Sequence, residues 1–398
     1  MLVVSTQFGQ QNIFSESNGR QTSMNSSLQS KPKILVVSRN PVGGIRTYFR
    51  YVYSQPSMAC FNKTLILPFD DNVEFYDNAF DKVLLEYASA SQSINKYWIG
   101  IIKSVIFNRP DIVHSHGLKT GVFLAPFCRL LGIKHIVTLH DVFDPYDFRG
   151  IKGPFKKWVL NIAFKFINVI NPCGRDVGAN IHEVFPNVRK DKIKVIQNGI
   201  SVEQFSTDHK RDLKSELHID SDAILLGYFG RFMRQKGFDI LRDAIIQLKA
   251  AGIRFEVACF GWGGFIREEQ AELKRLEIDS QFHFLPHTDE VGAAMRGLDV
   301  VVIPSRWEAC PLLPMEALVA GVPVIASNCI GLRDVCEDTP SLIFSSGASE
   351  ELSNAIKMFK NEQVRVLNQT KIFRKNALQR FDVKATSDAL KVIYDDLL

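Results

Sequence analysis

Short, continuous runs of apolar residues, most of them β-branched, alternate with longer segments of helical pattern from Lys33 onward. The runs cover residues 34–37, 112–114, 136–139, 193–196, 224–229, 255–260, 300–303 and 322–326. Strands that are apolar throughout are buried on both faces, which is typical of parallel sheets covered by crossover helices. The sequence therefore predicts the α/β class with doubly wound parallel sheets, whose ligands bind beyond the carboxyl ends of the strands.

The strand pattern restarts near Ile224, after a polar and charged stretch at residues 206–222. A chain of 398 residues suits two or three domains. We predict a disordered tail at residues 1–30 and an N-terminal Rossmann-like domain at residues 31–203. A C-terminal Rossmann-like domain at residues 204–380 would hold the nucleotide, and a last helix at residues 381–398 could pack back on the N-terminal domain. Two such domains would face each other across a cleft, where a ligand would bind.

The composition is that of a globular protein, with 46% hydrophobic residues and a net charge of +5. This charge is too small to indicate nucleic-acid binding by itself. The seven cysteines form no C-x-x-C pair, so buried free thiols in a reducing compartment are expected. With no run of about 18 apolar residues and no signal-peptide pattern, we expect a cytoplasmic protein.

Two glutamates, Glu308 and Glu316, stand with seven residues between them, just after the apolar run 300–303. The spacing predicts one carboxylate on a loop and the other inside a helix that begins near Pro311 and Pro314. Free N–H groups at the start of a helix can bind an anion. A nucleotide sugar, which carries both phosphates and hydroxyls, suits such a site.

The run 224–229 ends in a glycine followed by Arg231 and Lys236. Two cations at the carboxyl end of one strand could clamp a diphosphate, although a solvated basic turn has the same pattern. In the same way, Gly43 and Gly44 follow the first run and precede a helical segment. Their N–H groups could meet a phosphate, although a plain tight turn would also explain them, and the G-x-G-x-x-G dinucleotide pattern is missing.

Histidines follow two other apolar runs. His140 can exchange a hydrogen bond with a sugar hydroxyl, with Asp141 as an orienting partner, or it can be a structural histidine beside a helix-capping aspartate. His114 and His116 lack an evident third ligand, so we expect no metal site. Further on, residues 149–170 mix basic and aromatic side chains, which fits either an anionic membrane surface or an ordinary crossover helix with a solvated face.

Together these residues resemble the retaining glycosyltransferases of the GT-B fold, and in particular glycosyltransferase family 4 (group 1). The E-x7-E segment with its Ala-Gly-Val-Pro-Val turn carries most of the resemblance. Four weaker elements follow the order of the family, namely Gly43-Gly44, Thr138–Asp141, Asn198–Ile200 and Phe229–Gly237. The resemblance spans residues 33–395. Three positions depart from the family pattern, at Leu285–His287, Ala309–Pro311 and Ser201, and the first two leave the donor base and sugar open.

The resemblance implies how a nucleoside diphosphate sugar would be held. Arg231 and Lys236 would hold the diphosphate, which becomes the leaving group, and Gly43 and Gly44 would approach it. Glu316 would bind the ribose hydroxyls, and the N–H groups of Leu312 and Leu313 would meet phosphate or sugar. With cations on the phosphates, no metal or other cofactor is expected.

The resemblance also implies the chemistry. Glu308 and His140 would be the catalytic residues; Glu308 would contact the donor sugar and stabilise an oxocarbenium-like state, and His140 would lie against the ring. The expected enzyme is a hexosyltransferase of polysaccharide biosynthesis, with a glycan or lipid-linked glycan as acceptor. It could contact the inner face of the membrane through residues 149–170. The acceptor-binding residues are unknown. The alternatives are a nucleotide-sugar epimerase and a non-catalytic carbohydrate-binding relative. A dinucleotide-dependent oxidoreductase is a third alternative, which the missing dinucleotide pattern at Gly43 disfavours.

Overall fold

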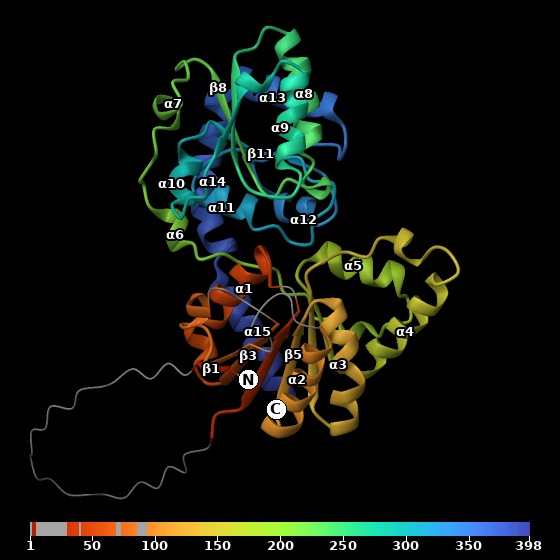
Figure 1. Cartoon of the computed structure of the whole chain (residues 1–398). Coiled ribbons are helices and arrows are strands. Elements are labelled where there is room, and N and C mark those ends of the chain that lie inside the picture. The colour runs from red at the N-terminus through yellow and green to blue at the C-terminus, as the bar shows by residue number, and fades with distance from the viewer. Residues whose placement is uncertain (1, 5–29, 40, 69–72, 86–93) are drawn as a thin grey trace, which may run out of the picture. The chain divides into compact units, whose positions relative to one another are not determined.

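The computed structural model describes residues 2–4, 30–39, 41–68, 73–85 and 94–398. The chain divides into two compact units (Figure 1). The first unit comprises residues 1–138, 162–169 and 390–398, and the second comprises residues 139–161 and 170–389. The first unit thus combines both ends of the chain, and residues 170–203 group with the second unit. Residue 1 and residues 5–29 of the predicted tail lie outside the described residues, whereas residues 2–4 form a strand.

The first sheet has seven strands in the order β1-β4-β3-β2-β5-β6-β7. Strands β2 to β6 pair in parallel, and β1 pairs antiparallel with β4 at one edge. The strands are β1 (Leu2–Val4), β2 (Lys33–Ser38), β3 (Asn62–Leu67), β4 (Lys82–Leu85), β5 (Ile112–His116), β6 (Lys134–Leu139) and β7 (Val169–Pro172).

The second sheet has six strands, all parallel, in the order β10-β9-β8-β11-β12-β13. The strands are β8 (Ile224–Phe229), β9 (Phe255–Phe260), β10 (Phe282–Leu285), β11 (Val300–Ile303), β12 (Val324–Ser327) and β13 (Leu342–Phe344). The predicted α/β class with two doubly wound sheets is therefore confirmed.

The apolar runs locate the strands well, with one error. The predicted strand at residues 193–196 is wrong, because this segment forms only an isolated bridge between Ile170 and Ile193. It runs beside β7 through hydrogen bonds from Lys194 N to Ile170 O and from Ile196 N to Pro172 O. Val195 is 43% exposed, so the run is not covered on both faces as a central strand would be. The shorter or more polar strands β3, β4, β7, β10 and β13 were not predicted.

Helices follow most of the strands. Between the strands of the first sheet lie α1 (Gly44–Tyr53), α2 (Ile94–Asn108), α3 (Leu118–Leu131) and α4 (Gly153–Phe166). After β7 come α5 (Arg175–Val184), α6 (Glu203–Ser206), α7 (Leu213–Glu216), α8 (Phe238–Ala250), α9 (Ile266–Arg275), α10 (Val291–Arg296), α11 (Leu313–Val319) and α12 (Leu332–Cys336). The chain ends in α13 (Ser349–Asn361), α14 (Gln363–Arg380) and α15 (Val383–Leu397). Residues 349–397 are therefore helical over almost their whole length, and α15 lies where the last helix was predicted.

Helix α8 shows how the helices build the core of the second unit. Its buried residues recur at helical spacing, so that one face of the helix is apolar; they are Phe238, Ile240, Leu241, Ala244, Ile245 and Leu248. This face packs with strands β8, β9 and β11 in one core cluster, and α13 packs against α8. Full burial of each large side chain contributes about 1.5–3 kcal/mol. The core thus holds the carboxyl end of β8 rigidly in place.

In both sheets the chain order reverses between two neighbouring strands. In the first sheet the reversal lies between β2 and β5, and in the second it lies between β8 and β11. The loops that leave two such strands turn to opposite sides of the sheet and open a crevice, which is where doubly wound sheets bind their ligands. Gly43 and Gly44 follow β2, Arg231 and Lys236 follow β8, and Glu308 follows β11.

Candidate functional site

The loops after β8 and β11 form the core of the site. Lys236 closes a short 3-10 turn at Arg234–Lys236, just before α8. Gly237 follows with φ +65°, and a Cβ atom placed there would lie 2.0 Å from the carbonyl oxygen of Pro304. Only glycine allows this backbone approach. The chain therefore needs Gly237 to bring the two loops into contact.

Lys236 and Glu308 are in direct contact. The ammonium Nζ donates a hydrogen bond to Oε1 of Glu308 at 2.6 Å, and the hydroxyl of Ser305 donates to the same oxygen at 2.7 Å. The Glu308 side chain is 8% exposed, whereas that of Lys236 is 25% exposed. A buried carboxylate without a partner would destabilise the protein. The hydrogen bonds from Lys236 and Ser305 avoid this cost, and they hold the carboxylate of Glu308 in one position. The predicted catalytic carboxylate and a predicted diphosphate ligand thus share one site.

Three further contacts tie the same two loops together. The guanidinium of Arg306 forms two hydrogen bonds with the carboxylate of Asp239, at 2.7 and 2.6 Å. The N–H of Arg306 donates to Gln235 O at 2.8 Å, and the side-chain amide of Gln235 donates to Trp307 O at 2.9 Å. We did not predict a role for these residues. Their positions in the sequence are distant, and no local pattern indicates such pairing.

Arg231 lies on the same loop as Lys236. Its carbonyl oxygen accepts a hydrogen bond from the hydroxyl of Tyr228 at 3.3 Å, which orients the backbone beyond β8. Within the described part of the chain, its half-buried guanidinium takes part in no ion pair. This cation therefore remains available for an anion.

Glu316 lies in the first turn of α11, as the sequence predicts, and Glu308 lies on the loop before the helix. Leu312 and Leu313 begin the helix, and Pro314 occupies its first turn, where N–H groups have no intrahelical acceptor. Burial raises the pKa of the Glu316 carboxyl to about 7. The group is therefore poised between its neutral and ionised forms at neutral pH.

His140 follows β6 and belongs to the second unit. Burial lowers its pKa to about 4, so the imidazole is neutral at neutral pH and can both donate and accept a hydrogen bond. Oδ1 of Asp141 accepts the N–H of Val142 at 2.9 Å. The alternative of a helix-capping aspartate is wrong, because the next turn, at Pro145–Phe148, is capped by Asp144.

In the first unit, Gly43 and Gly44 begin α1 after β2. Gly43 is the N-cap residue, and its carbonyl oxygen accepts the N–H groups of Arg46 and Thr47. A Cβ atom placed at either glycine would meet no atom of the described residues within 4 Å, so these residues leave space open beside the turn. A ligand could therefore approach the backbone here.

His114 and His116 are buried in a network of tyrosine hydroxyls in the first unit. Nδ1 of His114 lies 2.9 Å from the Tyr53 hydroxyl and 2.6 Å from the Tyr394 hydroxyl, and Nε2 of His116 lies 3.0 Å from the Tyr53 hydroxyl. The two imidazole rings stack 4.3 Å apart. These histidines link α15 to α1 and β5. The described residues contain no group of three potential metal-ligating side chains.

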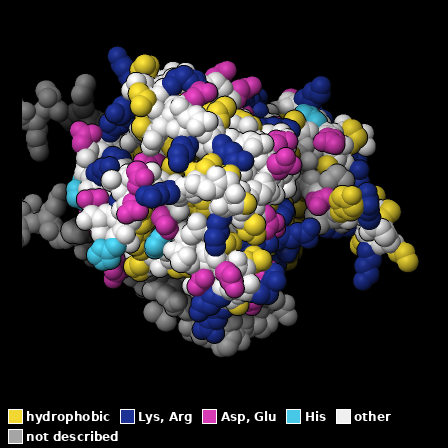
Figure 2. All heavy atoms as spheres, turned by 90° about the horizontal axis from the view of Figure 1, so that it is seen from above, with side chains coloured by type: hydrophobic (Ala, Val, Ile, Leu, Met, Phe, Trp, Pro, Cys, Tyr) yellow, Lys and Arg dark blue, Asp and Glu magenta, His cyan; other side chains and the backbone are white. Residues whose placement is uncertain are grey.

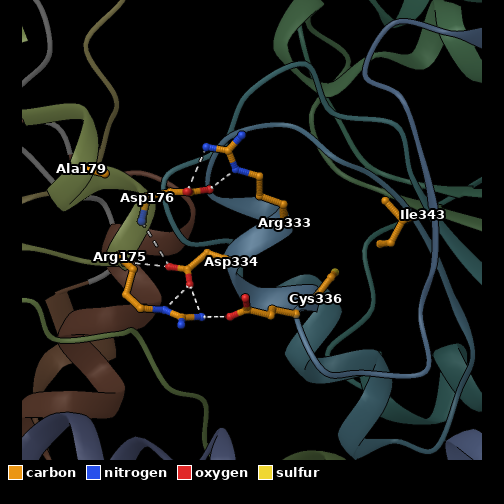
Figure 3. Close-up of a pocket in the computed structure, with 8 residues that line it drawn as sticks. Arg175, Asp176, Ala179, Arg333, Asp334, Cys336 and Ile343 are labelled. Atoms are coloured by element: carbon orange, nitrogen blue, oxygen red, sulfur yellow. Dashed lines mark hydrogen bonds and ion pairs between the residues drawn. The ribbon is translucent and has the colours of Figure 1, made fainter. Parts of the chain in front are cut away.

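A separate cavity of about 450 Å³ lies between α5 and α12 in the second unit (Figure 3). Its rim carries two arginine–carboxylate clusters. Arg175 binds Asp334 and Glu337, and Arg333 binds Asp176. None of these residues was predicted from the sequence. The glycines that precede α5 and α12, Gly174 and Gly331, are the local sequence feature that could have drawn attention to these helix starts.

Among the described residues, every helix is too short or too polar to serve as a membrane span.

Two families match most of the chain. Residues 42–204 match Glycosyltransferase Family 4, and residues 209–380 match Glycosyl transferases group 1. The two matches meet at residues 204–209, which follow the last strand of the first sheet in the sequence and precede the first strand of the second sheet.

Several curated proteins are similar in sequence. The 2-deoxystreptamine glucosyltransferase of Streptomyces kanamyceticus is 30% identical over 303 residues, which are 72% of this chain and 77% of that protein. The UDP-Gal:alpha-D-GlcNAc-diphosphoundecaprenol alpha-1,3-galactosyltransferase of Escherichia coli is 27% identical over 76% of this chain and 80% of that protein. For EpsF of Bacillus subtilis, which is 29% identical, the chain spans only 57% of the relative's length.

Solved structures share the fold. HepE of Anabaena, in complex with UDP-glucose, superimposes with a TM-score of 0.77 and 19% identity, over 91% of this chain and 99% of that chain. At this identity, the likeness establishes the architecture alone.

Proposed function

Because the chain belongs to glycosyltransferase family 4 (group 1) and is therefore a sugar-transferring enzyme, we propose that it is a retaining hexosyltransferase. The donor is a nucleoside diphosphate sugar, and the acceptor is a hydroxyl of a glycan or a lipid-linked glycan. The GT-B fold and the family, both expected from the sequence, are confirmed by the matches. The donor and the acceptor are inferred from the site and from the relatives.

The single observation that carries this proposal is the Lys236–Glu308 pair, at 2.6 Å, where the second sheet reverses its strand order. A cation and a carboxylate in contact suit a substrate whose leaving group is anionic and whose reacting centre becomes cationic. Lys236 and Arg231 would bind the diphosphate and neutralise the charge that builds on it as the bond to the sugar breaks. Glu308 would face the sugar and stabilise its oxocarbenium-like state.

The remaining predicted residues would complete the donor site. Glu316 would accept hydrogen bonds from the ribose hydroxyls, and the N–H groups of Leu312 and Leu313 would bind phosphate or sugar. His140, as a neutral imidazole, would hydrogen-bond a sugar hydroxyl. Gly43 and Gly44 would approach the diphosphate. With two cations on the phosphates, no metal ion would be needed.

In the proposed reaction, the bond between the anomeric carbon and the diphosphate oxygen breaks, and its electron pair leaves with the diphosphate. The acceptor oxygen bonds to the same face of the anomeric carbon, which retains its configuration. The hydroxyl proton passes to the departing phosphate oxygen. The products are therefore a glycoside and a nucleoside diphosphate.

Relatives favour a nucleotide sugar and a glycan or lipid-linked acceptor. The name of the Escherichia coli relative specifies UDP-Gal and an undecaprenol-linked diphosphate sugar, and the HepE complex contains UDP-glucose. These facts belong to those proteins. They make UDP-sugars and polyprenol-linked acceptors the first compounds to test here.

Thermal shift against UDP-, GDP-, ADP- and dTDP-sugars tests the donor, because a ligand selective for the native state raises the melting temperature. We expect one group of donors to raise it, and the same donors to yield free nucleoside diphosphate once an acceptor is added. An epimerized donor formed without acceptor would indicate an epimerase instead. Binding without any turnover across acceptors would favour a non-catalytic relative.

We also propose that the segment around the start of α4 contacts a membrane. Here Ile151 is 100% exposed, Tyr146 66%, Phe155 66% and Trp158 58%. The rings of Phe155 and Trp158 stack with their centroids 5.8 Å apart, so they form one apolar ridge. Contiguous exposed apolar side chains of this size are typical of an interaction surface.

The charges around this ridge favour an anionic partner. Arg149, Lys152, Lys156 and Lys157 flank it, and no acidic residue occurs between positions 148 and 175. At the right-hand edge of Figure 2, hydrophobic and basic side chains protrude together. Each cation near an anionic lipid surface contributes about 1 kcal/mol, and the apolar side chains would insert between headgroups. The enzyme would then act in the cytoplasm at the inner face of the membrane.

Co-sedimentation with vesicles tests the membrane contact. We expect binding to vesicles of phosphatidylcholine with about 30% phosphatidylglycerol and little binding to phosphatidylcholine alone, because salt-sensitive attraction adds to insertion. Phe155→Ser with Trp158→Ser should weaken binding at least about tenfold. Ile372→Ser, which removes an 80% exposed apolar side chain on α14, is the matched control. Equal binding by all three proteins would exclude this surface.

A further inference from the structure

Helices α5 and α12 each begin at a glycine and each receive a cap from the other helix. Gly174 and Gly331 are the N-cap residues, and neither has a side chain that could accept the free N–H groups. Instead, Oδ2 of Asp334, on α12, accepts the N–H of Arg175 at 2.6 Å. In return, Oδ2 of Asp176, on α5, accepts the N–H of Gly331 at 2.8 Å. The two aspartates therefore form a reciprocal cap (Figure 3).

Two arginines complete this reciprocal cap. Nε of Arg175 lies 2.7 Å from Oδ1 of Asp334, and Nε of Arg333 lies 2.8 Å from Oδ2 of Asp176. The Asp334 side chain is only 4% exposed, and that of Asp176 is 16% exposed, whereas both arginines lie at the rim. Removal of either arginine would leave a largely buried carboxylate without its charged partner, so all four side chains are needed to hold the arrangement in place.

The reciprocal cap holds the backbone that supports Glu308. The N–H of Glu308 donates to Ile330 O at 3.0 Å, and the next residue, Gly331, donates its N–H to Asp176. Gly331 has φ +78°, and a Cβ atom there would lie 2.3 Å from Glu308 O and 2.5 Å from Ala309 O. The Ile330–Gly331 segment is therefore in close contact with Glu308 on one side and is fixed by Asp176 on the other.

From this geometry we infer that Asp176 and Asp334 are positioning residues for the transfer reaction, because they fix the backbone on which Glu308 stands. The inference rests on the role of Glu308 under the proposed function. A shift of about 1 Å in a catalytic group can cost about a hundredfold in rate. The backbone that carries the diphosphate cations is held by contacts outside the reciprocal cap, because the Tyr228 hydroxyl donates to Arg231 O and the N–H of Lys236 donates to Met233 O. Loss of the reciprocal cap should therefore slow the reaction and leave nucleotide binding nearly unchanged.

The experiment compares Asp176→Ala and Asp334→Ala with wild type in three measurements. Turnover of the donor identified by thermal shift should fall about 30- to 100-fold. The Kd for the corresponding free nucleoside diphosphate should stay within about twofold, since the variants leave the backbone that carries Arg231 and Lys236 in place. Hydrogen exchange in peptides covering residues 305–312 and 328–335 should become at least about tenfold faster.

The Asn variants at the same positions keep an oxygen acceptor for the N–H groups and lose the charge. They should fold even if the Ala variants do not, and should lose about three- to tenfold in turnover. Asp191→Asn is the matched control, because it removes an exposed aspartate paired with Arg189. It should change none of the three measurements.

Three outcomes overturn the inference: unchanged turnover in the Asp176 and Asp334 variants, unchanged exchange in the two peptides, or equal losses of turnover and nucleotide affinity in the Asn variants. The last result would indicate general loosening of the second unit. A wild-type protein that turns over no donor would instead contradict the proposed function. Failure of the inference can thus be told apart from failure of the function.

Discussion

The ammonium nitrogen of Lys236 lies 2.6 Å from Oε1 of Glu308, although 72 positions separate the two residues in the chain. The contact exists because β8 and β11 are neighbours in the second sheet and their loops leave the same edge. In this ion pair the two opposite charges compensate each other before a substrate binds. A bound diphosphate would compete with Glu308 for the ammonium group of Lys236. Donor binding would therefore determine whether the predicted catalytic carboxylate is paired with this lysine.

Lys236→Ala should lower donor turnover at least about 10²-fold, the loss expected when one electrostatic contact to a developing charge is removed. It should also destabilise the protein by about 1–3 kcal/mol, because the buried Glu308 carboxylate loses its charged partner. Urea unfolding and donor turnover measure the two effects. In the double variant with Glu308→Gln, stability should recover and turnover should not. Lys249→Ala, at an exposed lysine that donates to Glu277 O, is the control.

Glu308→Gln by itself should also lower turnover at least about 10²-fold. The affinity for the free nucleoside diphosphate should change less than about threefold, because the proposed role of Glu308 concerns the sugar and not the phosphates. Isothermal titration with the nucleotide and a turnover assay give both values. A large loss of nucleotide affinity would contradict this division of roles.

Glu316 should make stability depend on pH. Its pKa is raised by burial from an ordinary value of 4.5 to about 7, so the native state holds this proton more tightly than the unfolded state does. This contribution to stability is therefore fully present below about pH 4.5 and is lost as the pH rises to about 7. Glu316→Gln should remove that decline in stability. The measurement is the urea midpoint of wild type and variant at pH 5, 6, 7 and 8, and the difference between the two proteins should change with pH.

The same titration should affect donor binding. An ionised Glu316 is the better acceptor for ribose hydroxyls, so donor affinity of the wild type should increase as the pH rises through about 7. Glu316→Ala should abolish this dependence and should lower donor turnover at least about 10²-fold. An unchanged pH profile in the variant would argue against contact between Glu316 and the donor.

Gly237→Ala should destabilise the second unit much more than Gly252→Ala. Both glycines have φ between +65° and +70°, which costs a residue with a side chain about 1–2 kcal/mol. At residue 237 the new Cβ would lie 2.0 Å from the carbonyl oxygen of Pro304, whereas at residue 252 it would meet no atom within 4 Å in the part of the chain that the structure describes. The difference in unfolding free energy should reach at least about 2 kcal/mol. Equal effects would mean that the two loops do not approach as closely as described.

Much of the fold could be predicted from the sequence because its strands are covered on both faces. Apolar runs such as 224–229 and 255–260 coincide with β8 and β9, and the loops that follow them carry the candidate site residues. The run 193–196 misled the prediction because its apolar residues lie beside β7 without completing a ladder. Local pattern cannot distinguish these two environments.

The sequence by itself determined the sheet class, the family and the edge on which Arg231, Lys236, Glu308 and Glu316 lie, because these depend on local periodicity and on residue order. Only the tertiary structure decided which side chains meet. The Lys236–Glu308 contact, the Arg306–Asp239 pair and the reciprocal cap of Asp176 and Asp334 join positions 72, 67 and more than 150 residues apart. Such pairs follow from strand order and close backbone packing, and neither of these leaves a periodic signal along the chain.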